Sequence, residues 1–264
     1  MTAPARPRGA WAAPARAAFS GAHRLAVVVV GAGFTLRRRR LVTSLRLRAL
    51  WHRSRLRLEV AGDVRLGRRV RVTVEPHVEA AVVVGRACKI GDDVRIELRH
   101  GGRLELGAGV DIRRGCRLGT GGLLRIDGPT LVQDGCTIHC DEQVHIGDHI
   151  ALAEYATVVD SSHYHDETER WFVHNVATRP VTIEHDAWIG AKATVARGVV
   201  VGAGAVVSAN SLVLRDVPPG ALASGVPASV VGEAPSRPGP SLQAVAGGVQ
   251  PAAGVAARSA SSSS

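Results

Sequence analysis

The chain has 264 residues and a formal net charge of +10, with 33 Lys or Arg residues against 23 Asp or Glu residues. Only 3% of its residues are aromatic, which argues against an ordinary packed globule and agrees with a solenoid, whose narrow interior is filled by stacked aliphatic side chains. Basic charge of this size often marks proteins that bind nucleic acid or acidic membranes. Because much of it lies outside the repeats described below, we predict no nucleic-acid partner.

Residues 1–57 are predicted to form a basic leader, disordered at its start, where proline and alanine dominate. Its apolar stretch, Leu25–Leu36, is shorter than the ~20 residues that cross a bilayer, and no convincing signal-peptide cleavage site follows it. Leu41, Leu45 and Leu50 share helical spacing with arginines between them, which indicates a short amphipathic helix or a solvated cap over the next segment. The leader is compatible both with packing on the rest of the chain and with peripheral membrane contact.

From about residue 58 to residue 232 the sequence has a six-residue period, which is plainest in Val181–Pro218. An aliphatic residue heads each block, and a small or β-branched residue follows four places later. A period of six fits neither an α-helix nor a half-buried strand, but it is the period of hexapeptide parallel β-helices. Three blocks then form one triangular coil, so we predict an all-β chain with the heads inside the prism. The predicted heads are Leu66, Val72, Val78, Val84, Ile90, Ile96, Leu106, Ile112, Leu118, Ile126, Val132, Ile138, Ile146, Leu152, Val158, Ile183, Ile189, Val195, Val201, Val207 and Val213.

Short breaks shift the register of the repeat at His100–Gly102, at Gly121–Gly122 and before Ile146, and each is expected to be a loop at a corner of the prism. A longer break, residues 160–180, is the first candidate for a functional site, because a compact domain rarely carries so long a loop without a use for it. Residues 233–264 are rich in Pro, Gly, Ala and Ser and are predicted to be a disordered tail.

The chain has four cysteines, and three of them, Cys88, Cys116 and Cys136, occupy the small inward position of their blocks. Cys136 and Cys140 flank His139, but no second pair of ligands accompanies them, as a structural zinc site would usually require. We therefore predict core thiols and no metal. Free thiols without a signal peptide indicate the reducing cytoplasm, with any membrane contact at the inner face.

The order IGDHIALAEYATVVDSSH, then a loop, then VTIEHDAWIGAKATVARGVVVGAGAVVSANSLVLRDVPPGALASGVPA resembles the left-handed β-helix acyltransferases. In particular it resembles the sugar O-acetyltransferases, which include the galactoside and maltose acetyltransferases and exopolysaccharide-modifying enzymes. The resemblance covers about Thr137 to Val231, whereas the upstream coils match only in period and the leader does not match. It implies a left-handed coil, a homotrimer with sites between neighbouring prisms, and transfer of an acetyl group from acetyl-CoA to a sugar hydroxyl in a ternary complex.

The resemblance also implies roles for particular residues. His163, which precedes Trp188 by 25 residues, aligns with the family's catalytic histidine, and Asp160 is the candidate carboxylate that orients its ring. A histidine with the ordinary pKa of about 6.5 is mostly neutral at pH 7 and can accept a proton. Trp188 and Ala191 match the motif that receives the pantetheine arm, and Ala191 can offer only its backbone N–H to an oxyanion. Further expected contacts of CoA are Ala209, Leu214 and Arg215.

On the acceptor side, Asp141 matches a carboxylate that binds the acceptor sugar. Gln133 stands where the family has an acceptor-binding asparagine, and this departure weakens the case for a galactoside-like acceptor.

Two other functions use the same prism. A γ-class carbonic anhydrase needs three zinc histidines from adjacent coils, for which the candidates are His139, His145 and His149, although their spacing does not match. A non-catalytic scaffold could use the basic leader to bind a membrane or an acidic partner. The tryptophan motif and the loop that holds His163 favour the acetyltransferase.

Overall fold

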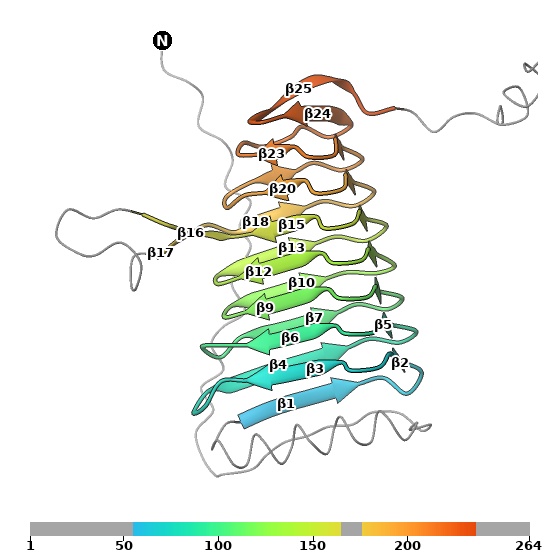
Figure 1. Ribbon diagram of the computed structural model, residues 1–264, viewed down its shortest axis with the longest axis vertical. Helices are drawn as coiled ribbons and strands as arrows, with labels where there is room; N and C mark the ends of the chain where they lie inside the picture. Colours follow the sequence, from blue (N-terminus) through green and yellow to red (C-terminus); the bar gives the residue numbers. More distant parts are fainter. Residues whose placement is uncertain (1–54, 165–175, 236–264) are drawn as a thin grey trace, which may run out of the picture.

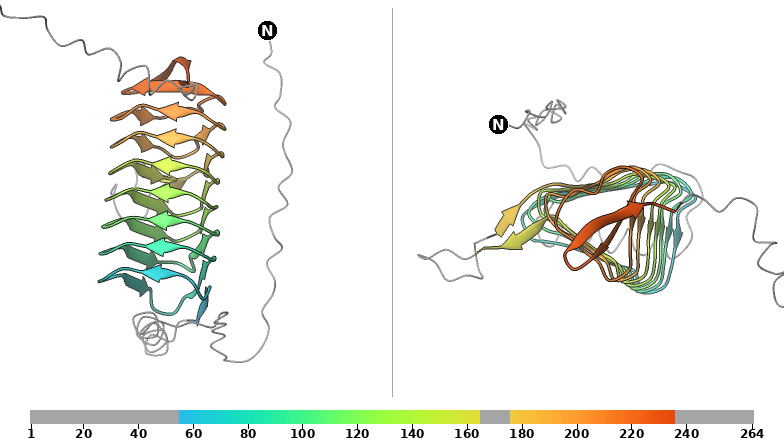
Figure 2. Two further views of the ribbon diagram at one scale, coloured as in Figure 1. Left: turned by 90° about the vertical axis from the view of Figure 1, so that its right-hand side faces the viewer. Right: turned by 90° about the horizontal axis from the view of Figure 1, so that it is seen from above.

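The computed structural model describes residues 55–164 and 176–235, and within these residues all regular structure is β-strand. The strands wind into a three-sided prism of seven coils that rises along one axis (Figure 1) and has a triangular outline in the view along that axis (Figure 2). Each side is a sheet whose coils pair in parallel, and we name the sides face A, face B and face C in the order in which the chain visits them.

The strands of the three faces have the following bounds. Face A contains β1 (Arg55–Val60), β4 (Glu79–Val84), β7 (Arg103–Leu106), β10 (Leu123–Ile126), β13 (Gln143–Ile146), β18 (Val181–Ile183) and β21 (Val200–Val201). Face B contains β2 (Arg65–Leu66), β5 (Lys89–Ile90), β8 (Asp111–Ile112), β11 (Leu131–Val132), β14 (Ala151–Leu152), β19 (Trp188–Ile189), β22 (Val206–Val207), β24 (Ala221–Gly225) and β25 (Ala228–Glu233). Face C contains β3 (Arg71–Val74), β6 (Arg95–Leu98), β9 (Arg117–Thr120), β12 (Thr137–Cys140), β15 (Thr157–Val159), β20 (Thr194–Val195) and β23 (Leu212–Val213).

The aliphatic heads fill the interior of the prism, as predicted. Ile183, Ile189 and Val195 are fully buried, while the residue before each of them points outward, because successive side chains of a strand face opposite sides. Leu66 and Val78 are only partly buried but pack against the core, and Val78 lies in the connection between β3 and β4. The first coil contains an additional block of six residues, which keeps the six-residue period of the sequence but adds no strand.

The register breaks all lie at one edge of the prism, where face C passes to face A. We call it the C/A edge, and the other two the A/B and B/C edges. The breaks predicted at His100–Gly102 and Gly121–Gly122 are loops between β6 and β7 and between β9 and β10, so the expectation of corner loops is confirmed. The longest break also leaves from this edge, as a hairpin of β16 (Ser161–His163) and β17 (Val176–Thr178) that projects away from the prism (Figures 1 and 2).

The B/C edge keeps the period strictly, and its backbone packs closely from coil to coil. A Cβ atom added to Gly190 would lie 2.5 Å from the backbone nitrogen of Ala209 in the next coil. Only a residue without a side chain therefore fits at position 190.

The described part of the chain ends in an antiparallel pair, β24 and β25, at the last coil of face B. The predicted leader, its helical segment, and the tail lie outside the described residues, apart from the first and last few positions. The described residues contain no helix of the length and apolar character needed to cross a membrane.

The four cysteines are buried and unpaired, which confirms them as core thiols. Burial, together with the charge of Asp160, raises the pKa of the Cys140 thiol to about 12. This thiol is therefore protonated at neutral pH and is a poor nucleophile.

Candidate active site

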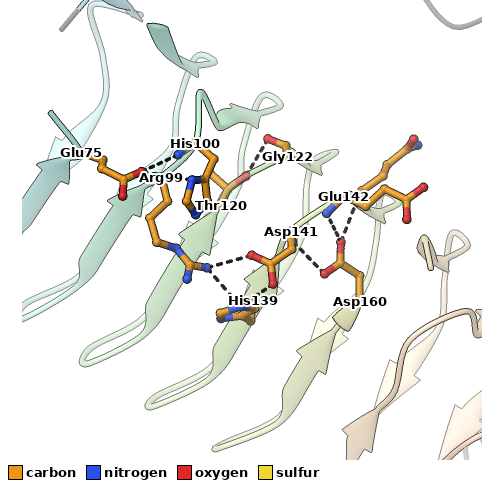
Figure 3. A network of polar contacts seen from close by, with 10 residues as sticks. Glu75, Arg99, His100, Thr120, Gly122, His139, Asp141, Glu142 and Asp160 are labelled. Atoms are coloured by element: carbon orange, nitrogen blue, oxygen red, sulfur yellow. Dashed lines mark hydrogen bonds and ion pairs between the residues drawn. The ribbon is translucent and has the colours of Figure 1, made fainter. Parts of the chain in front are cut away.

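A network of polar side chains lies on the C/A edge (Figure 3). Asp141, which follows β12, accepts a hydrogen bond from Arg99, with 3.2 Å between Nη2 of Arg99 and its Oδ1. Its Oδ2 lies 3.0 Å from Nε2 of His139, and the same ring nitrogen lies 3.1 Å from Nη2 of Arg99. The three groups are partly buried, so each limits the orientations open to the other two.

The surroundings of Asp141 lower the pKa of its carboxyl group. Burial acts to raise this pKa, but the hydrogen bond with Ser161, the interactions with His139 and the charge of Arg99 together outweigh it. Asp141 is therefore a carboxylate at neutral pH and can accept further hydrogen bonds.

Asp160 has a different role from the one predicted. Its side chain is fully buried, and its carboxylate accepts the backbone N–H groups of Asp141, Glu142 and Gln143, each at 2.8 Å (Figure 3). Its own backbone carbonyl accepts the N–H of Arg179, where the chain returns to the coil. The contacts of Asp160 hold the turn that carries Asp141 and the base of the excursion, so the carboxylate is engaged by backbone rather than by the ring of His163.

The first strand of the excursion begins beside the same network and carries His163 outward from it. Ser161 and His163 are the first and third residues of β16, so their side chains lie on one side of the strand, roughly 7 Å apart. The side chain of Ser161 hydrogen-bonds to Asp141. His163, which is exposed, therefore continues the polar row that begins at Arg99 and passes through Asp141 and Ser161.

The residues predicted to receive acetyl-CoA lie mainly on the other side of face C. Trp188 points outward from face B with half of its surface exposed, as expected from its place beside the buried Ile189. Ala191 and Ala209 follow at the B/C edge in successive coils, joined by a hydrogen bond of 2.8 Å from the N–H of Asn210 to the carbonyl of Ala191. These residues form one continuous strip.

Three other residues predicted to contact CoA or the acceptor lie away from the sites expected for them. Leu214 and Arg215 are exposed but lie at the C/A edge of the last coil, after β23. Gln133 lies at the B/C edge, where its N–H donates to the carbonyl of Leu152. Face C, at about five extended residues, is roughly 16 Å wide. The C/A and B/C edges on its two sides are therefore not brought together within one chain.

Comparisons with known proteins agree with the repeat and the fold. A sequence profile described as "Hexapeptide repeat of succinyl-transferase" matches residues 180–215. Galactoside O-acetyltransferase of Escherichia coli (strain K12) is 33% identical over 103 residues, which cover 38% of this chain and 49% of that protein. A Mycobacterium tuberculosis (strain H37Rv) protein named "Probable acetyltransferase Rv3034c" is 30% identical over 171 residues, or 64% of this chain and 50% of that protein. The chain is therefore similar to hexapeptide-repeat proteins and acetyltransferases over part of its length.

The chain spans about half the length of these two relatives. The crystal structure of the polySia specific acetyltransferase NeuO has the same hexapeptide-repeat β-helix fold. It aligns with a TM-score of 0.51 at 19% identity, covering 68% of this chain and 86% of that one. The profile match includes Trp188, Ala191 and Ala209, whereas Asp141 and His163 precede it.

The three histidines considered as zinc ligands do not converge within this β-helix. His139 contacts Asp141, His145 lies 2.7 Å from Asp127, and His149 contacts Asp148 at 2.9 Å. They belong to face C, face A and the A/B edge, and each has its own carboxylate. This arrangement disfavours the carbonic anhydrase alternative.

Sequence reasoning missed Arg99 and Ser161 as members of the site. One signal was available, because the register breaks of the hexapeptide repeat recur at a single edge and Arg99 directly precedes the first of them. Ser161 lies next to Asp160, but its pairing with Asp141 depends on how the excursion leaves the coil.

Proposed function

We propose that the protein is an acetyl-CoA-dependent O-acetyltransferase that acts on a hydroxyl group of a sugar or polysaccharide precursor. The observation that carries this proposal is the polar row of Asp141, Ser161 and His163 at the C/A edge. The relatives named as acetyltransferases, one of them a galactoside O-acetyltransferase, support the reaction and the class of acceptor. Acetyl-CoA is the donor substrate, and the reaction uses no protein-bound metal.

In this proposal His163 is the general base. Its imidazole takes the proton of the acceptor hydroxyl while the hydroxyl oxygen bonds to the thioester carbonyl carbon. Negative charge then develops on the carbonyl oxygen, to which the backbone N–H of Ala191 donates. When the carbon–sulfur bond breaks, the CoA thiolate takes the proton from the imidazolium, so the acetyl ester and CoA are formed and the histidine is neutral again.

The other residues bind and position the substrates. Asp141 accepts a hydrogen bond from an acceptor hydroxyl, and Gln133 contacts the acceptor from the B/C edge. Asp160 is a positioning residue, because it holds the turn that carries Asp141. The donor lies along Trp188, Ala191 and Ala209 and reaches Leu214 and Arg215 near its phosphates.

Assembly follows from the separation of the two edges. Because one chain keeps His163 and Trp188 on different sides of face C, a complete site needs the C/A edge of one subunit and the B/C edge of the next. Cyclic symmetry provides such a pairing once per subunit, and we propose a homotrimer. Face B supports packing against another copy, because its outward residues in the later coils are apolar. These are Leu131, Ala151, Trp188, Val206 and Leu222.

A thiol-release assay with acetyl-CoA and a panel of sugars tests the reaction. Release that depends on the acceptor, together with an acetyl ester detected by mass spectrometry, is the expected result. If none of the sugars in the panel leads to release of CoA, the result would favour the scaffold alternative. Zinc in the purified protein together with hydration of carbon dioxide would favour the carbonic anhydrase.

Mixed trimers test the shared site. At an acetyl-CoA concentration well below the raised Michaelis constant of Trp188→Ala, the variants His163→Ala and Trp188→Ala are each expected to have little activity, since each lacks one half of every site. After co-expression of the two, about a quarter of the sites combine an intact C/A edge with an intact B/C edge, so roughly that fraction of activity should return. No recovery from mixed trimers of confirmed composition would place both residues in sites formed by single chains.

A further inference from the structure

Face C presents a row of outward side chains that are in register, one from each coil. The row changes character along the prism, from three arginines through three threonines to one leucine. Its members are Arg71, Arg95, Arg117, Thr137, Thr157, Thr194 and Leu212. Because neighbouring strands lie about 4.8 Å apart, the three arginines span about 10 Å along the axis.

The three arginines, which we call the arginine row, place like charges beside one another. Arg71, Arg95 and Arg117 are all exposed. Like charges directly opposite on neighbouring strands are destabilising, so a β-helix gains no stability from this arrangement by itself. A ligand with negative charges would remove the repulsion.

Other arginines of the same coils are paired with carboxylates. Arg69 contacts Asp93 at 2.6 Å, and Arg114 contacts Asp134 at 3.3 Å. Arg95, by contrast, forms no ion pair with any residue of the described ranges, and the same holds for Arg117. Arg71 interacts with Asp93 only at longer range, and Glu97 on β6 is the carboxylate that shares face C with the row.

The arginine row leads directly to the proposed acceptor site. Thr137 continues the row after Arg117, and His139 is two residues further along the same strand, on the same face. His139 in turn contacts Asp141. The proposed donor strip lies in later coils and at the B/C edge, so the row is not placed for the phosphates of CoA.

We propose, resting on the function proposed above, that the acceptor is an acidic polysaccharide whose chain lies along face C. Its acid groups contact the arginine row, its hydroxyl groups contact the threonines, and the hydroxyl to be acetylated reaches Asp141 and His163. A row of three separate charges fits a polymer with repeated acid groups better than one isolated anion. The unpaired charges also oppose packing of face C against face C of other copies, which leaves this face available.

Binding of a labelled hexamer of galacturonic acid to the full-length protein tests the proposal, with maltohexaose as the neutral comparison. The variant Arg95→Gln/Arg117→Gln removes two charges from face C. The control Arg57→Gln/Arg125→Gln removes two exposed arginines from face A, so the change in net charge is equal. Fluorescence anisotropy at two salt concentrations gives the affinities, and light scattering and thermal melting confirm assembly. The single variant Arg117→Gln is used if the double variant melts early.

We expect the acidic hexamer to bind more tightly than maltohexaose and to weaken with salt, and the face C variant to lose about tenfold in affinity. The control should lose less than about twofold, because its charges lie on another face. Equal losses in both variants would overturn the proposal, as would equal binding of both sugars. If a short DNA duplex bound as tightly as the acidic hexamer, and also depended on the arginine row, the site would recognise charge alone. If the face C variant bound CoA more weakly, the row would belong to the donor site.

The proposed function and this inference fail separately. Acetyl transfer to a neutral sugar, with no row-dependent binding of the acidic hexamer, would retain the enzyme and overturn the acidic acceptor. Row-dependent binding without acetyl transfer to any acceptor would retain the binding surface and overturn the enzyme.

Discussion

The C/A and B/C edges are built from the same repeat but differ in how strictly they keep it. At the B/C edge the period never changes, and Gly190 leaves no room for a side chain between successive coils. At the C/A edge the connections vary in length, and Asp160 uses a buried carboxylate to hold backbone that the repeat does not organise. Arg99, His139 and Asp141 form a polar network at the C/A edge, whereas the small residues Ala191 and Ala209 line the B/C edge of the later coils.

Removal of His163 should have the largest effect of any change at the C/A edge. Loss of a general base typically lowers turnover by ~10²–10⁴-fold, and the Michaelis constants of both substrates should change little because the lost interaction belongs to the transition state. Steady-state kinetics of His163→Ala measure this. The matched control is His185→Ala, an exposed histidine near the A/B edge that contacts Asp186 at 2.8 Å. Near-normal turnover of His163→Ala would remove the C/A edge from the chemistry.

Two glycines compare the packing at one position of the B/C edge with that on face C. Gly190→Ala should lower the free energy of unfolding by about 3 kcal/mol, since its Cβ would meet backbone atoms that cannot move independently. Gly119→Ala, on face C near the C/A edge, should cost little, because its Cβ would meet only side-chain atoms of Arg99 and His139 at 3.7 and 3.9 Å. Denaturant titration of both variants makes the comparison. Equal tolerance would mean that the B/C edge is no more tightly packed than face C.

Substrate binding should also divide between the edges. Asp141→Ala should raise the Michaelis constant of the acceptor by about 10- to 150-fold, because a charge-assisted hydrogen bond contributes roughly 1.5–3 kcal/mol. Trp188→Ala should weaken acetyl-CoA more than the acceptor. Initial-rate measurements with each substrate varied in turn separate the two effects. If Asp141→Ala affects only the donor, its assignment to the acceptor is wrong.

The smallest expected effect concerns the acid stability of the C/A edge. The pKa of Asp141 is lower in the folded chain than in the unfolded one, so its contribution to stability is present above about pH 4 and is lost as the pH falls through the folded value. Asp141→Asn lacks this contribution and should show a flatter loss of stability below about pH 4. Thermal midpoints measured across this range test it. Parallel curves for the two proteins would contradict the assigned cause.

The sequence predicted the regular parts of the molecule because the information there is local. A six-residue period places Ile183 and Ile189 inside, and the alternation of a strand then places Trp188 outside. The contact between Arg99 and Asp141 joins residues 42 positions apart, and it depends on the lengths of two C/A connections that the period does not fix. The resemblance named Asp160, but only the structure assigns its carboxylate to three backbone N–H groups. The pairing of edges between subunits stays a prediction.

The antiparallel pair at the end of face B affects how one prism meets another. A parallel coil leaves unpaired N–H and C=O groups on its last turn, and these could template a second prism stacked end to end. β25 turns back along β24 and therefore presents a strand of opposite direction, on which a further coil of the same kind cannot continue the parallel sheet. Continuation of the parallel coil into a second prism is thus disfavoured on face B by a reversal of chain direction rather than by charge.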